Sequence, residues 1–366
     1  MTKLNPINDP DRLITLAIHT YERALLLKSR LADAGINSEL ANVNLQHEVA
    51  ASGVRVRILE RDLPLALKVV ESDVERPRQP RTGCVLVPVD FSDYSMKACK
   101  VGFEYARKIG GTVILLHSYI NDRHRFMMPL PSTSGSEERQ MRVMARQRMA
   151  QFVADVRTRM AQGELPQVGV VSEVTEGIPE ECILECASKT DVVLIVMGTR
   201  GSDQKEHDML GSVTAEVLDA GSFPIFTVPE NISLSHISAI KHVAFFSNLI
   251  QQDLISFDIF SRLFAGNGMK VTIIPVVEKK EDDCIAKSLA DLVDYCSEHY
   301  SGFEFATKRL NAKRFIGQFQ QLVADDHIDL IVVPNKKKNI FSRLFNPSLA
   351  HRVLFQSDVP MLVVPV

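Results

Sequence analysis

Short apolar runs alternate with longer amphipathic patterns through most of the chain. The segment 85–118 reads VLVPVDFSDYSMKACKVGFEYARKIGGTVILLHS, in which two apolar strands enclose a loop and an amphipathic helix that ends at two glycines. Nearly continuous apolar strands separated by helices are typical of a parallel sheet with both faces covered. The pattern predicts strands at 84–89, 112–118, 168–174, 192–197 and 223–228, and helices at 94–109, 138–162, 178–188 and 212–220. We therefore expect an α/β fold with a doubly wound, five-stranded parallel sheet.

The same order of elements occurs a second time. The segment 243–276, VAFFSNLIQQDLISFDIFSRLFAGNGMKVTIIPV, aligns with 85–118 without a gap at an offset of 158. DVVLIVMG at 191–198 parallels DLIVVPN at 329–335, and FPIFTVPE at 223–230 parallels VPMLVVPV at 359–366 at an offset of 136. The difference falls on 119–142, which is rich in Met, Pro, Ser and Gly and is interpreted as a mobile insertion. We predict two α/β repeats, at 83–230 and 231–366.

A smaller unit precedes the repeats. LITLAI predicts a strand, 21–34 a helix closed by Gly35, INSELANV and GVRVRILE two more strands, and 62–71 a short helix. This order predicts a small α+β domain over 13–73, after a tail at 1–12. The connection VERPRQPRT at 74–82 is rich in Pro and Arg, as semi-rigid linkers are.

Composition adds limits on compartment and partners. The chain is 45% hydrophobic and 24% charged, as ordinary globular proteins are, and its formal net charge of -3 argues against nucleic acid as the main partner. It shows no signal peptide and no apolar run of 18 residues, so we expect a cytoplasmic protein without a membrane partner. Without CxxC pairs, its six cysteines are interpreted as buried thiols; they are Cys84, Cys99, Cys182, Cys186, Cys284 and Cys296.

The stretch after the fourth predicted strand has the spacing of a phosphate cradle. Gly198 and Gly201 are separated by two residues, and nine residues later Gly211 and Ser212 open a helix. Glycine lets the backbone adopt positive φ and approach a ligand closely. Free amides and the hydroxyls of Ser212 and Thr214 at a helix N-terminus favour phosphate.

The end of the first predicted strand would form the opposite wall. Asp90 lies just past the sheet edge, where its carboxylate can accept hydrogen bonds from ribose hydroxyls or an adenine amino group. Ser118, which ends the second strand, would offer backbone groups to the base. Each feature also has a purely structural explanation, because glycines serve tight turns and Ser212 or Asp90 can cap a helix.

These residues resemble the ATP-binding branch of the universal stress protein family. Its pattern Gly-x2-Gly-x9-Gly-[Ser/Thr] is matched in full, and its strand end P-[VT]-D-x-S is matched at 88–92. The resemblance covers about residues 83–366 and implies an adenine nucleotide α hydrolase-like fold. It also implies that the first repeat binds ATP, with or without Mg²⁺, through Pro88, Val89, Asp90, Ser118, Met197, Gly198, Arg200, Gly201, Gly211, Ser212, Val213 and Thr214. The domain at 13–73 loosely resembles small prokaryotic domains described as signal-transducing, and no site is drawn from it.

The second repeat departs from the pattern. Aligned on the flanking strands, Asp90 becomes Asn248 and Pro88 becomes Phe246, and only the serine survives, as Ser348. The three glycines become Asn335, Lys338 and Pro347. Side chains and a missing amide would occupy the space of the phosphates, so we expect no ATP in this repeat. The run at 336–338 is interpreted as a solvated charged loop, with an anion site as the alternative.

Three functions are compatible with the sequence. The first is a nucleotide-dependent stress-response or signalling protein, in which the alike strands at 226–229 and 362–365 pair within one chain as a pseudo-dimer, or between chains in a homodimer. The second is an ATP-hydrolysing or adenylating enzyme. The sequence has no SGGxDS, HIGH-like or KMSKS-like motif, and His117 is interpreted as a packed residue, so we expect no enzyme beyond weak ATP hydrolysis. The third is a ligand-free scaffold.

Overall fold

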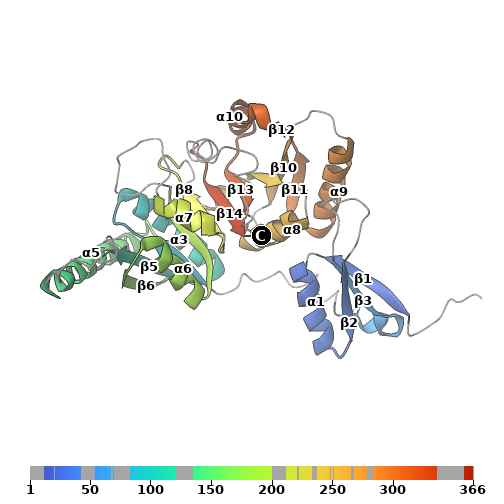
Figure 1. The fold of residues 1–366 in the computed structure, drawn as a ribbon, viewed down its shortest axis with the longest axis horizontal. Helices are drawn as coiled ribbons and strands as arrows, with labels where there is room; N and C mark the ends of the chain where they lie inside the picture. Colours follow the sequence, from blue (N-terminus) through green and yellow to red (C-terminus); the bar gives the residue numbers. More distant parts are fainter. Residues whose placement is uncertain are drawn as a thin grey trace, which may run out of the picture. The chain divides into compact units, whose positions relative to one another are not determined.

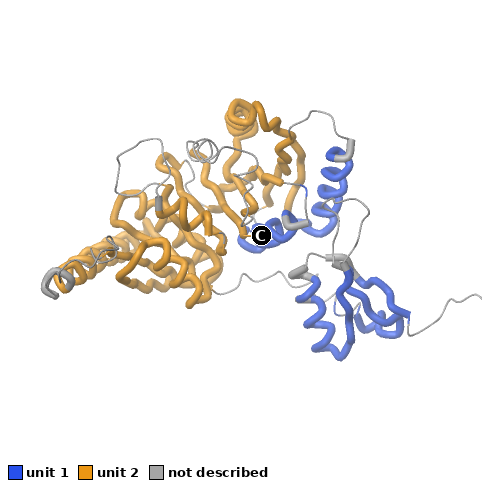
Figure 2. The backbone as a smooth tube through the Cα atoms, in the orientation of Figure 1, with its two compact units in different colours: residues 1–79, 248–265, 281–301 blue, residues 80–247, 266–280, 302–366 orange. Residues whose placement is uncertain are grey.

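The structure is a computed structural model. It describes residues 12–19, 21–42, 54–66, 69, 83–120, 135–199, 212–220, 222–232, 237–247, 249, 251–264, 268–277, 283–335 and 358–365. The chain divides into two compact units (Figure 2). The first comprises Met1–Gln79, Asn248–Ala265 and Glu281–Ser301, and the second Pro80–Ser247, Gly266–Lys280 and Gly302–Val366. The domain boundaries drawn from the sequence follow the repeats instead, and they stay predictions.

The first unit contains a small antiparallel sheet. Its strands β1 (Leu13–His19), β2 (Ser38–Asn42) and β3 (Val54–Leu59) lie in the order β1-β3-β2. Helix α1 (Tyr21–Asp33) ends before Gly35, whose φ of 77° is favourable only for glycine. Its side chains share a core with those of β3, made of Ala24, Leu27, Leu31, Val56 and Ile58 among others. The predicted strand–helix–strand–strand order is confirmed, and a 3-10 turn at Glu60–Asp62 precedes helical residues 63–66.

The same unit also contains helices α8 (Gln251–Phe264) and α9 (Asp283–His299). On α8, the Asp258 side chain is 2% exposed and accepts a hydrogen bond from the Tyr300 hydroxyl at 3.4 Å. The Tyr300 ring packs edge-on against Phe257, with the ring centroids 4.7 Å apart. These contacts tie the middle of α8 to the residue that follows α9.

The second unit is built on one large sheet (Figure 1). Its strand order is β11-β10-β9-β13-β14-β8-β7-β4-β5-β6, and the short β12 (Leu310–Asn311) pairs with β10. The pairs along this order are parallel except β8 with β14, which is antiparallel. The strands are β4 (Cys84–Pro88), β5 (Thr112–Tyr119), β6 (Gly169–Glu176), β7 (Val192–Gly198), β8 (Ile225–Val228), β9 (His242–Ser247), β10 (Met269–Val277), β11 (Phe303–Thr307), β13 (Leu330–Asn335) and β14 (Met361–Pro365).

The sheet has a front half, β4 to β8, and a rear half, β9 to β14. The front order β8-β7-β4-β5-β6 is the same as the rear order β14-β13-β9-β10-β11. The five predicted front strands are confirmed, with ends within two residues of the predicted ones. The helices are confirmed within three residues as α3 (Asp93–Ile109), α5 (Gly135–Ala161), α6 (Pro179–Lys189) and α7 (Ser212–Ala220). The predicted insertion is bounded by Tyr119, which ends β5, and by α5, and 121–134 lie outside the described residues.

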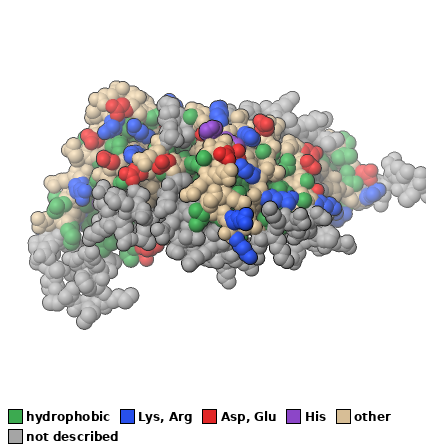
Figure 3. Space-filling model, turned by 90° about the horizontal axis from the view of Figure 1, so that it is seen from above, with side chains coloured by type: hydrophobic (Ala, Val, Ile, Leu, Met, Phe, Trp, Pro, Cys, Tyr) green, Lys and Arg blue, Asp and Glu red, His purple; other side chains and the backbone are tan. Residues whose placement is uncertain are grey.

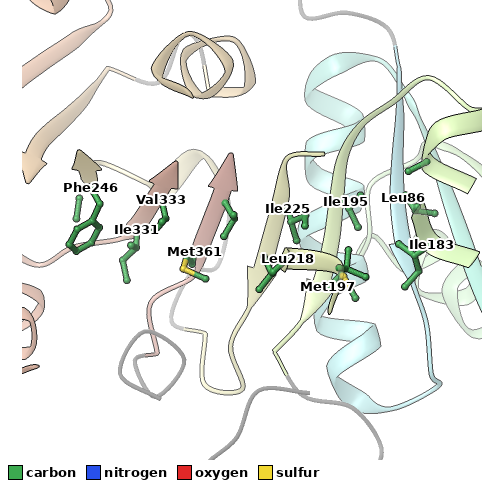
Figure 4. Close-up of a cluster of buried hydrophobic side chains, with 14 of the residues drawn as sticks. Leu86, Ile183, Ile195, Met197, Leu218, Ile225, Phe246, Ile331, Val333 and Met361 are labelled. Atoms are coloured by element: carbon green, nitrogen blue, oxygen red, sulfur yellow. The ribbon is translucent and has the colours of Figure 1, made fainter. Parts of the chain in front are cut away.

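Helices cover both faces of the front half. On one face α3 crosses close to β4, because Gly102 has no side chain: an added Cβ would lie 2.7 Å from Val87 Cγ2. On the other face Leu86 and Ile195 pack with Ile183 of α6 and Leu218 of α7 (Figure 4). The doubly wound α/β fold is therefore confirmed.

One apolar cluster runs through both halves of the sheet on the α6 and α7 face. It contains Ile225 of the front half and Met361 and Val333 of the rear half, which lie in one row in Figure 4. Helix α10 (Phe315–Asp326) adds Phe315 and Phe319, which stack with their ring centroids 5.6 Å apart. A shared core of this kind makes the two halves one packed body, because burial of apolar surface is the main stabilising term in folding.

The described cysteines fit the interpretation as packed thiols. Cys99, Cys182, Cys186 and Cys296 are buried thiols, Cys84 is a half-buried thiol, and the side chain of Cys284 lies outside the described residues. Burial raises the pKa of the Cys99 thiol to about 12, and burial beside the Glu173 carboxylate raises that of Cys186 to about 11. Thiols held this far from ionisation are poor nucleophiles at neutral pH.

Charged side chains of both signs are interspersed on the face drawn in Figure 3, as the small formal net charge of -3 leads one to expect. Within the described ranges, none of the helices combines the length and the apolar character that crossing a membrane requires.

Candidate functional site

The strand order reverses between β4 and β7. From β4 the chain adds β5 and β6 on one side, and it then returns to add β7 and β8 on the other. Because β4 is parallel to both β5 and β7, the carboxyl ends of these three strands meet at one edge of the sheet. Helix α3 leaves this edge on one face and α7 on the other. Ligands of open α/β sheets bind in the crevice at such a switch point.

Asp90 lies two residues beyond β4, at this crevice, and its carboxylate is held by serines. Oδ1 accepts hydrogen bonds from the Ser92 amide at 3.0 Å, the Ser92 hydroxyl at 2.5 Å and the Ser95 hydroxyl at 2.6 Å. The Ser92 hydroxyl also accepts from the Ser95 amide at 3.3 Å, which makes Ser92 the N-cap of α3. Hydrogen bonds of this kind favour the ionised carboxylate and fix its direction. The site therefore offers a fixed anionic acceptor.

Ser95 was not predicted as a site residue. It is 5% exposed, and its hydroxyl donates a hydrogen bond to Asp90 Oδ1. The same hydroxyl accepts a hydrogen bond from the Asp90 amide at 3.0 Å. The signal in the sequence was the spacing of Asp90, Ser92 and Ser95, which places two hydroxyls in the first turn of a helix that begins just after a carboxylate. Ser95 thus closes the loop between strand and helix around Asp90.

Phe91, beside Asp90, has an unusual backbone. Its φ is 66°, in the left-handed region that bulky residues seldom adopt, and such strain is concentrated at functional sites. Its ring packs on His117 with the centroids 4.2 Å apart and edge-on against Phe152 of α5 at 5.8 Å. The Arg148 guanidinium lies over the ring, 4.7 Å from its centroid. These contacts hold the strained loop in place.

His117 is a packed residue, as predicted. Its Nδ1 lies 2.8 Å from the Val89 carbonyl oxygen, which can only accept, so Nδ1 carries the proton in this contact. Burial lowers the pKa of His117 and is the largest influence on it. The contact with the Val89 carbonyl opposes this shift, the Arg148 cation adds to it, and Asp90 opposes it least. The imidazole is therefore mainly neutral at pH 7 and serves to join β5 to the end of β4.

The end of β7 meets the start of α7 at the other side of the crevice. The Thr214 hydroxyl, in a side chain that is 5% exposed, donates to the Gly198 carbonyl at 3.0 Å. Gly198 itself is the last residue of β7 and pairs with Val228. The positive-φ glycines of the described residues do not include Gly198, so the expectation that it leaves the strand with positive φ is wrong. Gly198 stays extended because it is still part of the parallel ladder.

The other predicted residues fall into two groups. Met197, 4% exposed, belongs to the apolar cluster and Val213 packs against it, so both support the site from within the core. At the crevice edge, Val89 donates its amide to the Leu116 carbonyl at 2.8 Å, Pro88 ends β4, and Ser118 pairs with Thr175 near the end of β5. Arg200, Gly201, Gly211 and the side chain of Ser212 lie outside the described residues.

The rear half requires one correction. In the front half Leu86 pairs with Ile195 and Ile195 with Ile225. In the rear half Ala244 pairs with Ile331 and Ile331 with Met361. These three equivalent strand positions make Pro334 the counterpart of Gly198. The prediction of Asn335 at this place is wrong by one residue.

Two further observations concern the rear half. Leu249, the counterpart of Phe91 at the offset of 158, also has a positive φ, of 57°. Asn335 is therefore not the counterpart of Gly198. Its Nδ2 donates a hydrogen bond to the Leu218 carbonyl of α7 at 2.6 Å. The predicted replacements Asn248, Lys338 and Pro347, the surviving Ser348 and the run 336–338 lie outside the described residues, whereas Phe246 lies in β9, buried in the shared cluster.

The described residues at the switch point present polar groups from both faces of the sheet. Among them are the Asp90 carboxylate on one side and the N-terminus of α7 on the other. Within the described residues, no group of three or more His, Cys, Asp or Glu is placed to hold a metal ion. A carboxylate suits hydroxyl and amino donors, and a helix N-terminus suits an anion.

A parallel sheet covered on both faces, with a carboxylate and a helix N-terminus at its switch point, defines a doubly wound α/β protein. The sequence model of the Universal stress protein family matches residues 83–229. A universal stress protein of Methanocaldococcus jannaschii is 31% identical over 144 residues, which cover 39% of this chain and 80% of that protein. The chain belongs to the universal stress protein family.

The fold extends beyond the matched segment. The crystal structure of a universal stress protein from Archaeoglobus fulgidus superposes with a TM-score of 0.56 and 16% identity, over 78% of this chain and 99% of that chain. At this identity the likeness concerns the fold alone, and the superposition is broader than the segment that matches the family in sequence.

Proposed function

We propose that the front half binds ATP and that the chain is a cytoplasmic, nucleotide-dependent stress-response or signalling protein. The observation that carries the proposal is the placement of Asp90 and of the N-terminus of α7 on the two sides of the switch point. Asp90 would accept hydrogen bonds from the ribose or the adenine amino group. The helix N-terminus, with the glycines of the sequence pattern, would hold the triphosphate.

We further propose that the chain is a tandem of two universal stress protein repeats, arranged as an intramolecular pseudo-dimer. The equal strand orders of the halves, their equivalent residues with positive φ and the antiparallel pair of β8 and β14 support this. At the joint Phe226 pairs with Leu362, and the Thr227 hydroxyl donates to the Met361 carbonyl at 3.3 Å. Two like edges that meet antiparallel are the arrangement of an isologous dimer.

The rear half, in this proposal, holds no ATP. Pro334 stands where the front half has Gly198 and supplies no amide hydrogen, and Asn248 replaces the carboxylate of Asp90. Only one nucleotide per chain is expected.

The protein is proposed to bind ATP without rapid turnover. His117, the imidazole at the crevice edge, is engaged by the Val89 carbonyl and by Phe91. Phosphate release faster than about 1 per second that one side-chain substitution abolishes would instead favour the enzyme reading.

Calorimetric titration of the whole chain with ATP, with and without Mg²⁺, tests the proposal. We expect one site per chain. The Gly211→Val variant should bind about tenfold or more weakly, because losing a charge-assisted amide contact costs roughly 1.5 to 3 kcal/mol. Gly302→Ala, at a position where an added Cβ has nothing within 4 Å, is the control. A protein that carries no nucleotide when purified and ignores ATP in titration is a scaffold, and the proposal then fails.

A further inference from the structure

The rear half contacts the front half at the carboxyl end of helix α7. Asn335, the last residue of β13, donates from Nδ2 to the Leu218 carbonyl oxygen at 2.6 Å. Leu218 lies in the last turn of α7, where carbonyl groups have no amide partner within the helix. The Asn335 side chain is therefore a C-terminal cap that reaches α7 from a position 117 residues away in sequence.

Helix α7 depends on contacts of this kind. It has nine residues, and a helix this short is not stable by itself in water. Its first turn is tied to β7 by the bond from Thr214 to Gly198, and its last carbonyl, of Ala220, accepts from the Ser222 hydroxyl at 3.1 Å. Along its length Val217 is fully buried in the cluster that also contains Met361. Both polar and apolar restraints on α7 thus include residues of the rear half.

The register of the strands shows why the Asn335 side chain is not at the position of the site glycine. Pro334, not Asn335, corresponds to Gly198, so Asn335 lies one residue beyond the equivalent of the site glycine. Its side chain is only half-buried and serves the neighbouring half. The rear half has a proline at the position of the glycine and carries at the adjacent position a donor directed at the front half.

We propose that Asn335 is a positioning residue for the front site, and that the rear half, which holds no nucleotide of its own, acts as a built-in partner that sets the position of α7. The proposal rests on the proposed function, because the N-terminus of α7 is the end that would hold the triphosphate. A displacement of the carboxyl end moves the whole short helix, and with it the amides at the other end. The rear half then contributes to affinity without touching the ligand.

The variant Asn335→Asp separates this role from packing. It keeps the shape of the side chain but replaces the amide donor with a carboxylate, which is repelled by the carbonyl end of a helix. Thr227→Val is the matched control, since it removes the side-chain hydrogen bond to Met361 at the same joint without touching α7. Each variant is measured for ATP affinity by calorimetry, for urea unfolding, and for hydrogen exchange of the amides at 212–220 without nucleotide.

Asn335→Asp should raise the ATP dissociation constant about three- to tenfold and accelerate exchange in α7, whereas Thr227→Val should change the constant less than about twofold. Asn335→Gln, which restores an amide, should recover part of the affinity. Wild-type affinity in Asn335→Asp, or equal losses in both variants, would overturn the inference. If the wild-type chain binds no ATP the proposed function fails, and unchanged exchange in α7 of Asn335→Asp still decides against the capping role.

Discussion

The front and rear halves of the sheet are alike in fold and different at the crevice. Both have five strands in the same order, and both place a bulky residue with positive φ after the first strand, Phe91 in front and Leu249 in the rear. The front half has Asp90 after its first strand and Gly198 at the end of its fourth. The rear half has Asn248 and Pro334 at these places. The fold is thus specified by buried strands, whereas the proposed ATP binding would depend on a few residues at strand ends, which can differ without loss of the fold.

A second contrast concerns the helix that follows each first strand. In front, Ser95 donates to the carboxylate of Asp90. At the offset of 158 its counterpart is Asp253, which is 2% exposed, and the counterpart of Asp90 is an asparagine. The rear half therefore has no carboxylate at the position of Asp90, and the carboxylate of Asp253 lies on α8 instead.

The largest expected effect comes from breaking the joint between the halves. Phe226 of β8 is fully buried and pairs with Leu362 of β14. Phe226→Ala should lower the free energy of unfolding by about 3 to 5 kcal/mol, the usual cost of deleting a buried aromatic ring. Urea unfolding followed by circular dichroism measures it. Val171→Ala, at a site 47% exposed on β6, should change stability by less than about 0.5 kcal/mol, and a similar small loss for Phe226→Ala would mean that the joint is not a core.

The next effect concerns the residue that distinguishes the crevices most. Asp90→Asn, which makes the front strand end like the rear one, should weaken ATP binding about tenfold or more, or about 1.4 kcal/mol, because a charged acceptor is lost. Calorimetry measures the change, and Asp93→Asn, exposed in the first turn of α3, is the control. If Asp90→Asn binds as well as the wild type, the carboxylate does not contact the nucleotide.

A smaller effect is expected for Ser95→Ala. The change removes the hydroxyl that holds Asp90 Oδ1, while the two donors from Ser92 remain. We expect a two- to fivefold weaker ATP affinity and a loss of about 1 kcal/mol in stability. Ser95→Thr, which keeps the hydroxyl, should recover most of the affinity. Recovery by Ser95→Val to the same extent would show that only shape matters.

The smallest effect is a pH dependence that belongs to the front half. The pKa of His117 is lowered in the folded chain, so at mildly acid pH the unfolded chain binds the extra proton more readily. The contribution of neutral His117 to the free energy of unfolding is therefore fully present above the unfolded pKa of about 6.5. It is lost as the pH falls below that value. Urea unfolding at pH 7.5 and 5.5 should show a smaller difference in His117→Gln than in the wild type. An equal difference would assign the pH dependence to other groups.

Much of the front half could be predicted from the sequence, because its strands are continuous apolar runs bounded by turn residues. The register of β13 could not. LIVVPN is buried along nearly its whole length, so it lacks the alternation of apolar and polar residues that fixes a register, and a shift by one residue satisfied the pattern equally well.

At the candidate site, the residues at the strand ends could be predicted from the sequence, but the contacts that hold them in place could not. The topology brings Asp90 and Gly198 to one switch point, as the repeated order of elements indicated. The positive φ of Phe91 opposes the local preference of a bulky residue and is stabilised by contacts with His117 and Phe152, which come from distant segments. The bond from Asn335 to Leu218 joins residues that no local pattern connects. Contacts of this kind depend on the tertiary fold.

The antiparallel pair of β8 and β14 has a consequence for how the molecule behaves on dilution. Two separate chains that meet through such strands come apart when the protein is scarce, whereas strands on one polypeptide face each other at a local concentration that the linker sets. If the rear half positions α7 as proposed, this effect would not depend on the protein concentration in the cell. Occupancy of the front site would report the nucleotide level alone.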